Sequence, residues 1–567
     1  MPKKGRLALA SSLFLLIGIL VAACGGDDNG AATGNQTYKY TQPTHRGGTI
    51  LWSDWQFPDS TNPWFLTVQV DANIAAGLWA APLTVTSQAT YVPDQLTEVP
   101  TQANGDVSKD GKTVTMNLRH DLKWSDGQPI TADDFVYWLQ VDQDPATGAG
   151  NTTGYDQIAS AQAKDKYTVV LHYKQPFAPY LAYLPYAAPQ HAWGGIANSA
   201  MATNREVNLA PPVTSGPFLV SDFAAGQSVT MVPNKYYVST TLHPSAIDKL
   251  VFKGYESKDS LIAGYQAGET DHAEDFTAAD LKKINSLPGL RISPAISYEH
   301  LDFNLQNATL QDLNVRKGIE QAIDRCQIIQ TIYSTECSKL SVDTILPQPS
   351  PYYDASIKAL PFNLDQAKKD MQAAGWNCPG NTPCTKNGKD FPTLNLVTTS
   401  GNTVRQNVTQ VVQQDLTALG VPVNLNGQYY AAGVLFGDFD SGGILATGQY
   451  DLALFAYNFP VEPDGSLYPS FHSSEIPNKQ NPGGGNWEHV SNPQVDQALD
   501  QGRTTLDPNK RTQIYKDLQK TLVQQVYTIP MYLRPDITLT SSVIGNYYSN
   551  PTSAGNTWNV GDWYRKQ

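Results

Sequence analysis

The stretch WSDGQPITADDF, residues 124–135, is the part of this sequence that most narrows what the chain can fold into. Asp126 and Gly127 have the chemistry of a tight turn. Thr131 and Asp134 have the spacing of a capping box, in which a hydroxyl and a carboxylate satisfy amide donors in the first turn of a helix. The stretch therefore predicts a turn followed by a helix, and its carboxylates are interpreted as scaffold rather than as an active site.

The residues before this stretch have the pattern of a strand. Val114, Met116 and Leu118 alternate with polar residues, which predicts a β-hairpin that turns at Asp110 and Gly111. Further strands are predicted near residues 50–52, 166–176 and 227–237.

Helical patterns lie mainly in the second half of the chain. One run places a set of apolar residues on a single face: Val315, Ile319, Ala322, Ile323 and Cys326. Three more helices are predicted from their caps and stop signals, over residues 363–375, 402–420 and 506–526. Strands and helices alternate from about residue 390 onward, so we expect a mixed α/β architecture.

The N-terminus has the features of a targeting segment. Three basic residues precede the apolar run LALASSLFLLIGILV, and small residues follow directly before Cys24. This pattern resembles the lipobox of bacterial lipoproteins, in which residues 1–23 would be removed and Cys24 would carry the lipid. Residues 24–45 then predict a flexible tether, because they are rich in Gly, Asn, Asp and Thr. An ordinary signal peptide with an incidental cysteine is the alternative.

The charge of the chain argues against a nucleic-acid partner. The formal net charge is −13, and removal of residues 1–23 deletes three positive and no negative charges, which gives −16. The sequence also shows no clustered stripe of Lys and Arg.

The remaining four cysteines are expected to form disulfides in an oxidising, extracytoplasmic space. Their spacing favours local pairing of Cys326 with Cys337 and of Cys378 with Cys384, although four cysteines allow three connectivities. No metal site is expected, because these cysteines form no CxxC pair and have no histidine close by.

The segment DGKTVTMNLRHDLKWSDGQPITADDFVYWL closely resembles the signature of extracellular solute-binding proteins of the peptide/nickel type, which serve ABC importers. Five other stretches are similar to that family in the same order: SGPFLVSDFAAGQSVTMVPNKYY, FNLQNATLQDLNVRKGIEQAIDRCQII, LPFNLDQAKKDMQAAGW, YDLALFAYNF and SNPQVDQALDQG. The resemblance covers nearly the whole chain after the tether.

This resemblance implies an α/β, two-lobed clamshell of the periplasmic-binding-protein type with an extra small domain in the first lobe. Lobe I would comprise residues 46–84, 211–300 and 530–567, the extra domain residues 85–210, and lobe II residues 301–529. The stretches SYEHLDFNL and VYTIPMYL would cross between the lobes as a hinge. The implied role is capture of an oligopeptide by a monomer that has no cofactor, is anchored to the membrane by its lipid and partners an ABC permease.

The resemblance and the strand pattern also suggest ligand-binding residues. Tyr457 and Asn458 end a predicted strand, where open α/β sheets favour ligands. Asn304 and Gln306 follow the first crossover. Three aromatic residues of the first loop are expected to face the cleft, where flat rings give a large contact area: Trp55, Phe57 and Trp64.

The acid with which peptide-binding members of the family hold the ligand's amine has no direct counterpart here. Phe459 or Pro460 stands at its position, and either Glu462 or Asp464 is a substitute, since a carboxylate in a cleft pairs well with an ammonium. A solvated turn is the alternative for the stretch that contains both acids.

Rival functions find less support in the sequence. A hydrolase would need a motif such as GxSxG, HExxH or SxxK, and the sequence contains none of the three. The stretch DFDSGGILATGQ opens like a calcium loop, but Gln449 stands where a bidentate Glu is required. An oligosaccharide-binding protein of the same family is the main alternative, because tryptophans stack on sugars and a sugar needs no acidic partner.

Overall fold

The computed structural model describes residues 38–567 except residues 151, 153, 459 and 553. The predicted signal peptide, Cys24 and most of the predicted tether lie outside the described residues. Within the described part of the chain, no helix is both long and apolar enough to cross a membrane.

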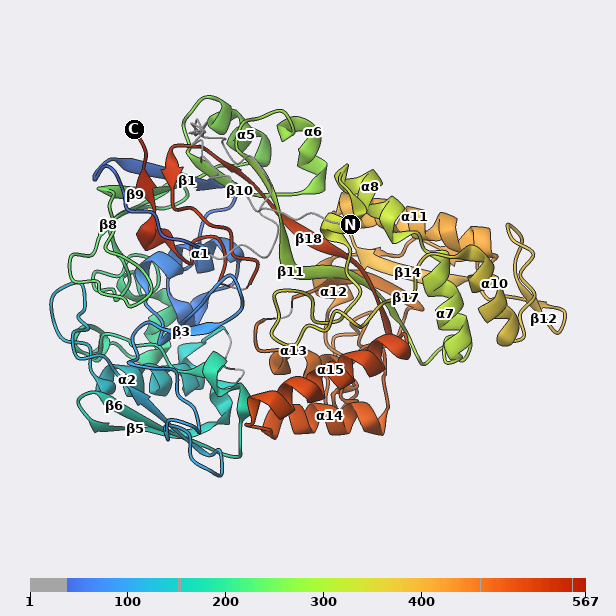
Figure 1. Ribbon diagram of the computed structural model, residues 1–567, viewed down its shortest axis with the longest axis horizontal. Coiled ribbons are helices and arrows are strands. Elements are labelled where there is room, and N and C mark those ends of the chain that lie inside the picture. The colour runs from blue at the N-terminus through green and yellow to red at the C-terminus, as the bar shows by residue number, and fades with distance from the viewer. Residues whose placement is uncertain (1–37, 151, 153, 459, 553) are drawn as a thin grey trace, which may run out of the picture. The chain divides into compact units, whose positions relative to one another are not determined.

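A mixed β-sheet of 11 strands passes through the described chain (Figure 1). Its first part contains β7 (Phe218–Ala224), β8 (Ser228–Pro233), β9 (Lys249–Gly254), β1 (Thr49–Asp54) and β10 (His272–Phe276), in this spatial order. Two long antiparallel strands follow, β18 (Thr528–Thr540) and β11 (Leu290–Phe303). The second part contains β17 (Leu452–Tyr457), β14 (Leu394–Thr399) and β15 (Val423–Asn424), and β16 (Tyr429–Tyr430) also pairs with β14.

Both predicted crossovers lie in the two central strands. SYEHLDFNL falls largely in β11 and VYTIPMYL largely in β18, and the two strands pair along most of their length. One hydrophobic cluster continues past the predicted lobe boundary at residue 300, from Leu261 and Phe276 to Leu301 and Val408. The extended conformation of both stretches is confirmed, while the hinge role and the lobe boundaries stay predictions.

A separate three-stranded sheet has the order β4 (Thr113–Asn117), β6 (Thr168–Tyr173) and β5 (Ile158–Asp165). Helix α2 (Ala132–Gln143) packs on β5 and β6 (Figure 1). The predicted hairpin is only partly correct. Gly111 does turn, with φ +70°, but Val114 makes a single bridge to Val107, and β4 pairs along its length with β6 instead. A partner 50 residues away could not be inferred from an alternating pattern.

The capping box predicted at the start of α2 is confirmed. The Asp134 carboxylate accepts hydrogen bonds from the amide of Thr131 at 2.8 Å and from its hydroxyl at 3.3 Å. Gly127, with φ +93°, makes the turn before it, and the Asp126 carboxylate accepts from the amide of Gln128 at 3.0 Å. The stretch is therefore scaffold, as its sequence predicts.

Three long helices begin and end close to their predicted bounds: α10 (Leu364–Ala373), α11 (Thr403–Leu419) and α15 (Pro508–Gln524). Gly420 ends α11 in the left-handed conformation, with φ +102°. The predicted helix over residues 315–326 is wrong as one element. It is divided into α7 (Leu313–Ala322) and α8 (Arg325–Tyr333), because Ile323 is extended and the Asp324 side chain caps α8 by accepting from the Gln327 amide.

The other α-helices of the described chain have 4 to 12 residues. They are α1 (Gln69–Leu78), α3 (Gln190–Trp193), α4 (Arg205–Asn208), α5 (Lys258–Gln266), α6 (Leu281–Ile284), α9 (Cys337–Leu340), α12 (Ala432–Leu435), α13 (Asp464–Phe471) and α14 (Pro493–Thr504). Short two- and three-residue strands, β2 (Leu83–Val85) with β3 (Tyr91–Pro93), β12 (Thr385–Lys386) with β13 (Lys389–Asp390) and β19 (Ile544–Gly545) with β20 (Tyr564–Arg565), form separate pairs.

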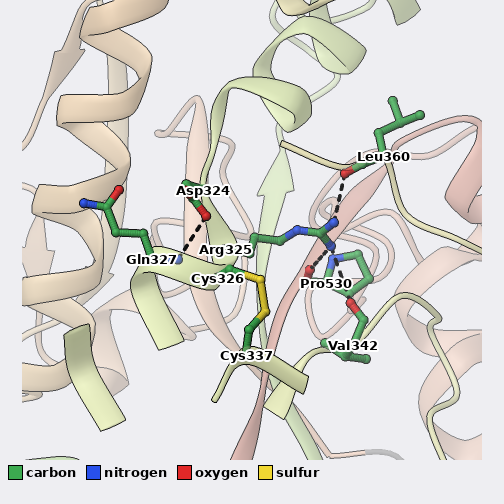
Figure 2. Close-up of a disulfide and its surroundings, with 8 residues drawn as sticks. All are labelled: Asp324, Arg325, Cys326, Gln327, Cys337, Val342, Leu360 and Pro530. Carbon is green, nitrogen blue, oxygen red and sulfur yellow. Dashed lines mark hydrogen bonds between the residues drawn. A yellow bond between two sulfur atoms is a disulfide. The ribbon is translucent and has the colours of Figure 1, made fainter. Parts of the chain in front are cut away.

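Both predicted local disulfides are present. Cys326–Cys337 joins α8 to α9, and Cys378–Cys384 closes a loop after α10. Beside the first, the Arg325 guanidinium donates to the carbonyl oxygens of Leu360 and Pro530, both at 2.9 Å (Figure 2). The disulfide and this arginine together hold α8 and α9 against β18.

Candidate ligand-binding site

A cavity of about 480 Å³ lies where segments of all three predicted parts of the chain meet. This volume is within the range of about 300–1,000 Å³ that is usual for small-ligand sites. Its walls are mainly Ala, Leu, Pro, Tyr and Trp side chains, and no Lys, Arg or His of the described residues lines it. The lining comes from residues 63–94, residues 181–186, Pro217, Tyr237, Leu242, residues 460–462, Ala554 and Trp558.

Glu462 reaches this cavity from the predicted lobe II, but its carboxylate already has a partner. Arg511 of α15 donates from its two terminal nitrogens to the two Glu462 oxygens, at 2.6 and 2.8 Å. Glu462 is only 6% exposed, so the pair is buried. Bidentate, charge-assisted pairing of this kind is strong and geometrically specific.

Asp464 is paired in the same way with Arg503, which donates to its carboxylate at 3.1 and 3.2 Å. Burial raises the pKa of Asp464 above its ordinary value, and the positive charge of Arg503 opposes this rise. Asp464 is the first residue of α13 and does not line the cavity. Both acids predicted to hold an ammonium are thus neutralised by arginines, and their ligand-binding role stays a prediction.

Tyr457 and Asn458 lie at the end of β17 but outside the cavity lining. The Tyr457 hydroxyl donates to Glu488 at 2.6 Å, and its ring stacks on His300 with the centroids 3.6 Å apart. Burial, together with the negative charge of Asp302, raises the pKa of Glu488 well above its ordinary value. Tyr457 therefore belongs to a buried polar network, whereas Asn458 is exposed.

Asn304 and Gln306 shape a loop. The Asn304 side chain donates to the carbonyl oxygens of Gly448 at 3.1 Å and Tyr450 at 2.8 Å, and it accepts from the Gln306 amide at 3.0 Å. The Gln306 side chain lies 3.3 Å from a ring nitrogen of His489. These bonds hold the chain after β11 and do not reach the cavity.

The three predicted aromatic residues pack elsewhere. Trp64 is 2% exposed and lies against Trp138 and Trp193 in the core. Phe57 packs between the rings of Phe223 and Phe252. The Trp55 indole donates to Asp275, with the ammonium of Lys258 above its ring. Of the predicted ligand-binding residues, all of which fall in the described chain, Glu462 alone lines the cavity.

The sequence did not predict most of the residues that line the cavity. Trp79, Tyr91, Tyr183 and Tyr237 contribute aromatic surface, and Asp94 contributes a carboxylate. They come from short segments with no motif and no regular spacing. The sequence gives a signal only at Asp94, which stands two positions from the apolar residues Val92 and Leu96 in the segment YVPDQL, where strand alternation would place it on the same buried face.

Asp94 differs from the other acids of the site because one of its oxygens has no partner. The residue is 3% exposed, and its Oδ1 atom makes no hydrogen bond to any residue that the structure describes. Burial raises the pKa of Asp94 to about 6, against the opposing effects of Ser239 and Arg119. The site therefore contains one buried acid that lacks a cationic partner.

Comparison with known proteins identifies the family of this chain. The family model for bacterial extracellular solute-binding proteins, family 5 middle, matches residues 85–478. The chain belongs to this family. Its homologues are substrate-binding proteins of ABC transporters and not enzymes.

Individual family 5 members resemble this chain along almost its whole length. The oligopeptide-binding protein AppA of Bacillus subtilis is 24% identical over 557 residues, which is 97% of this chain and 97% of that protein. The structure of that protein in complex with a nonapeptide has a TM-score of 0.68 at 21% identity and covers 92% of this chain and 100% of that one. NikA from Brucella suis, in complex with Fe(III)-EDTA, has a TM-score of 0.75 at 18% identity, with 92% and 100% covered. The fold is the two-lobed α/β fold of periplasmic binding proteins.

Proposed function

We propose that this chain is the membrane-anchored, extracytoplasmic receptor of an ABC importer and that it captures an oligopeptide between its lobes. The single observation that carries the proposal is the cavity of about 480 Å³, to which the predicted lobe I, extra domain and lobe II all contribute. The family supports a solute-binding role, and the name of the relative from Bacillus subtilis supports a peptide as the solute.

The rest of the proposal rests on the N-terminal sequence. The apolar run followed by small residues and Cys24 supports a lipoprotein that is held at the outer face of the cell membrane. The two local disulfides support an oxidising compartment. Incorporation of labelled palmitate into the full chain, and its loss in Cys24→Ser, tests the anchor.

The oligosaccharide alternative has less support. Trp55 and Trp64 were its expected stacking residues, and both are engaged outside the cavity. Trp79 and Trp558 do line the cavity, but each indole nitrogen is already bonded to a backbone carbonyl and each ring is mostly buried.

The test is mass spectrometry of ligands released from the full chain purified from membranes in detergent. Peptides in the denatured extract, which compete with added tripeptides in calorimetry, are the expected result. Co-purified sugars, or heat of binding from oligosaccharides and none from peptides, would contradict the proposal.

A further inference from the structure

Asp94 lies at the start of a chain segment that is fixed by its backbone. It follows β3, its amide donates to the carbonyl of Pro82 at 3.1 Å, and its own carbonyl accepts from the Arg119 guanidinium at 3.1 Å. Arg119 also pairs with Asp121 at 2.8 Å, and no salt bridge joins it to the Asp94 carboxylate. These hydrogen bonds of its main chain fix the position of Asp94, and they do not involve its carboxylate oxygens.

The unused atom belongs to the cavity. Asp94 is a lining residue, and Tyr237, whose pKa its negative charge helps to raise, also lines the cavity. The Oδ1 atom of Asp94 is buried and has no hydrogen-bond partner among the described residues. Burial of a carboxylate oxygen without a hydrogen-bond partner costs free energy, so we expect a bound ligand to supply the missing donor.

The unpartnered carboxylate oxygen of Asp94 sets this residue apart from the nearby acids Glu462 and Asp464. Glu462 and Asp464 each pair with an arginine, whereas no lysine, arginine or histidine in the described part of the chain lines the cavity beside Asp94. The lining therefore presents one net carboxylate surrounded by apolar and aromatic surface. This combination is complementary to a ligand that carries a protonated amine on an apolar body.

We propose that Asp94 is a ligand-recognition residue that forms a charge-assisted hydrogen bond with a protonated amine of the bound solute. The inference rests on the proposed function and specifies which peptides the site selects. The amine has two possible sources, the free α-amino group of a peptide or the side chain of a lysine, and the chemistry at Oδ1 is the same for both.

The experiment is competitive retention on the full chain in detergent. The probe is an equimolar mixture of random tripeptide amides without lysine, the same tripeptides N-acetylated, and N-acetylated tripeptides that contain one lysine. Retained peptides are identified by mass spectrometry for the unchanged protein, for Asp94→Asn and for the control Asp142→Asn. Asp142 is also buried, has an unpartnered oxygen and lies in α2, away from the cavity.

The unchanged protein and Asp142→Asn are expected to retain peptides with an amine over fully acetylated ones. Asp94→Asn should lose about 30-fold of this preference, since loss of one member of a buried charge pair costs at least about 2 kcal/mol. Preference for free α-amino peptides alone, or for the lysine peptides as well, identifies the source of the amine.

Two failures are distinct. If the unchanged protein retains peptides without regard to the amine, or if Asp94→Asn keeps the preference, the role of Asp94 is refuted while peptide binding stands. If no peptide of any kind is retained, the proposed function itself fails and this inference fails with it. Thermal unfolding of each variant shows that retention is compared between folded proteins.

Discussion

Removal of the Glu462 carboxylate should destabilise the protein strongly, because this carboxylate is the buried counter-ion of Arg511. In Glu462→Gln, Arg511 stays buried without its counter-ion, because both side chains are 7% exposed. Breaking a buried pair by the loss of one partner costs about 3–5 kcal/mol. Arg511 keeps its bonds to the Gly502 carbonyl at 2.7 Å and to the Tyr352 hydroxyl at 2.5 Å, so the lower end, about 3 kcal/mol, is expected.

The measurement is urea unfolding of four proteins: unchanged, Glu462→Gln, Arg511→Met and the double variant. Because the double variant leaves no uncompensated charge, it should be more stable than the sum of the single losses predicts, with a coupling free energy of about 2–3 kcal/mol. The neighbouring pair of Asp464 and Arg503 is the matched control. Arg503 is 27% exposed, so Asp464→Asn should cost only about 1 kcal/mol. Additive losses at Glu462 and Arg511 would refute the claim that this pair is electrostatically coupled.

Three further results are expected. Affinity for an amine-bearing peptide should fall as the pH drops through about 6, because protonation of Asp94 removes the negative charge that pairs with the amine. Calorimetry between pH 5 and 8 should show this fall for the unchanged protein and none for Asp94→Asn. Burial, together with the negative charge of Asp94, raises the pKa of Tyr237 well above its ordinary value, so this neighbour of Asp94 keeps its proton over the same range. Burial raises the pKa of Asp142 to about 7, so the ionised form of this residue destabilises the fold at higher pH. Asp142→Asn should therefore raise the free energy of unfolding by about 2 kcal/mol at pH 8 and leave it unchanged at pH 4. Trp64→Ala should cost about 3–5 kcal/mol in urea unfolding and leave the amine preference intact, and a lost preference would return Trp64 to the site.

Local features of the fold were predictable because local chemistry determines them. The capping box of Thr131 and Asp134 needs residues three positions apart, and Gly420 ends α11 through its own backbone conformation. The disulfides followed the same logic, since Cys378 and Cys384 are separated by a short loop.

The cavity was not predictable in the same way. Its walls come mainly from residues 63–94, 181–186, 460–462 and 554–558, with Pro217, Tyr237 and Leu242, and no local pattern shows that these segments meet. Glu462 was found because an acid there suits an amine, but the arginine that neutralises it is 49 positions further along the chain. We expected Trp64 to face the cleft because nothing in the sequence indicates that Trp138 and Trp193 pack against it.

The continuous sheet constrains how a receptor of this kind would open. Strands β11 and β18 stay in register from Leu290 to Pro294, and the register shifts before Tyr298 and again between Glu299 and His300. We predict that a rotation of β14 and β17 against β1 and β9 would be absorbed as twist in this short irregular stretch, because the regular ladders on either side resist shear. The stiffness of that stretch would therefore set the free-energy gap between open and closed receptor. Substitutions there would tune apparent affinity without touching a ligand atom.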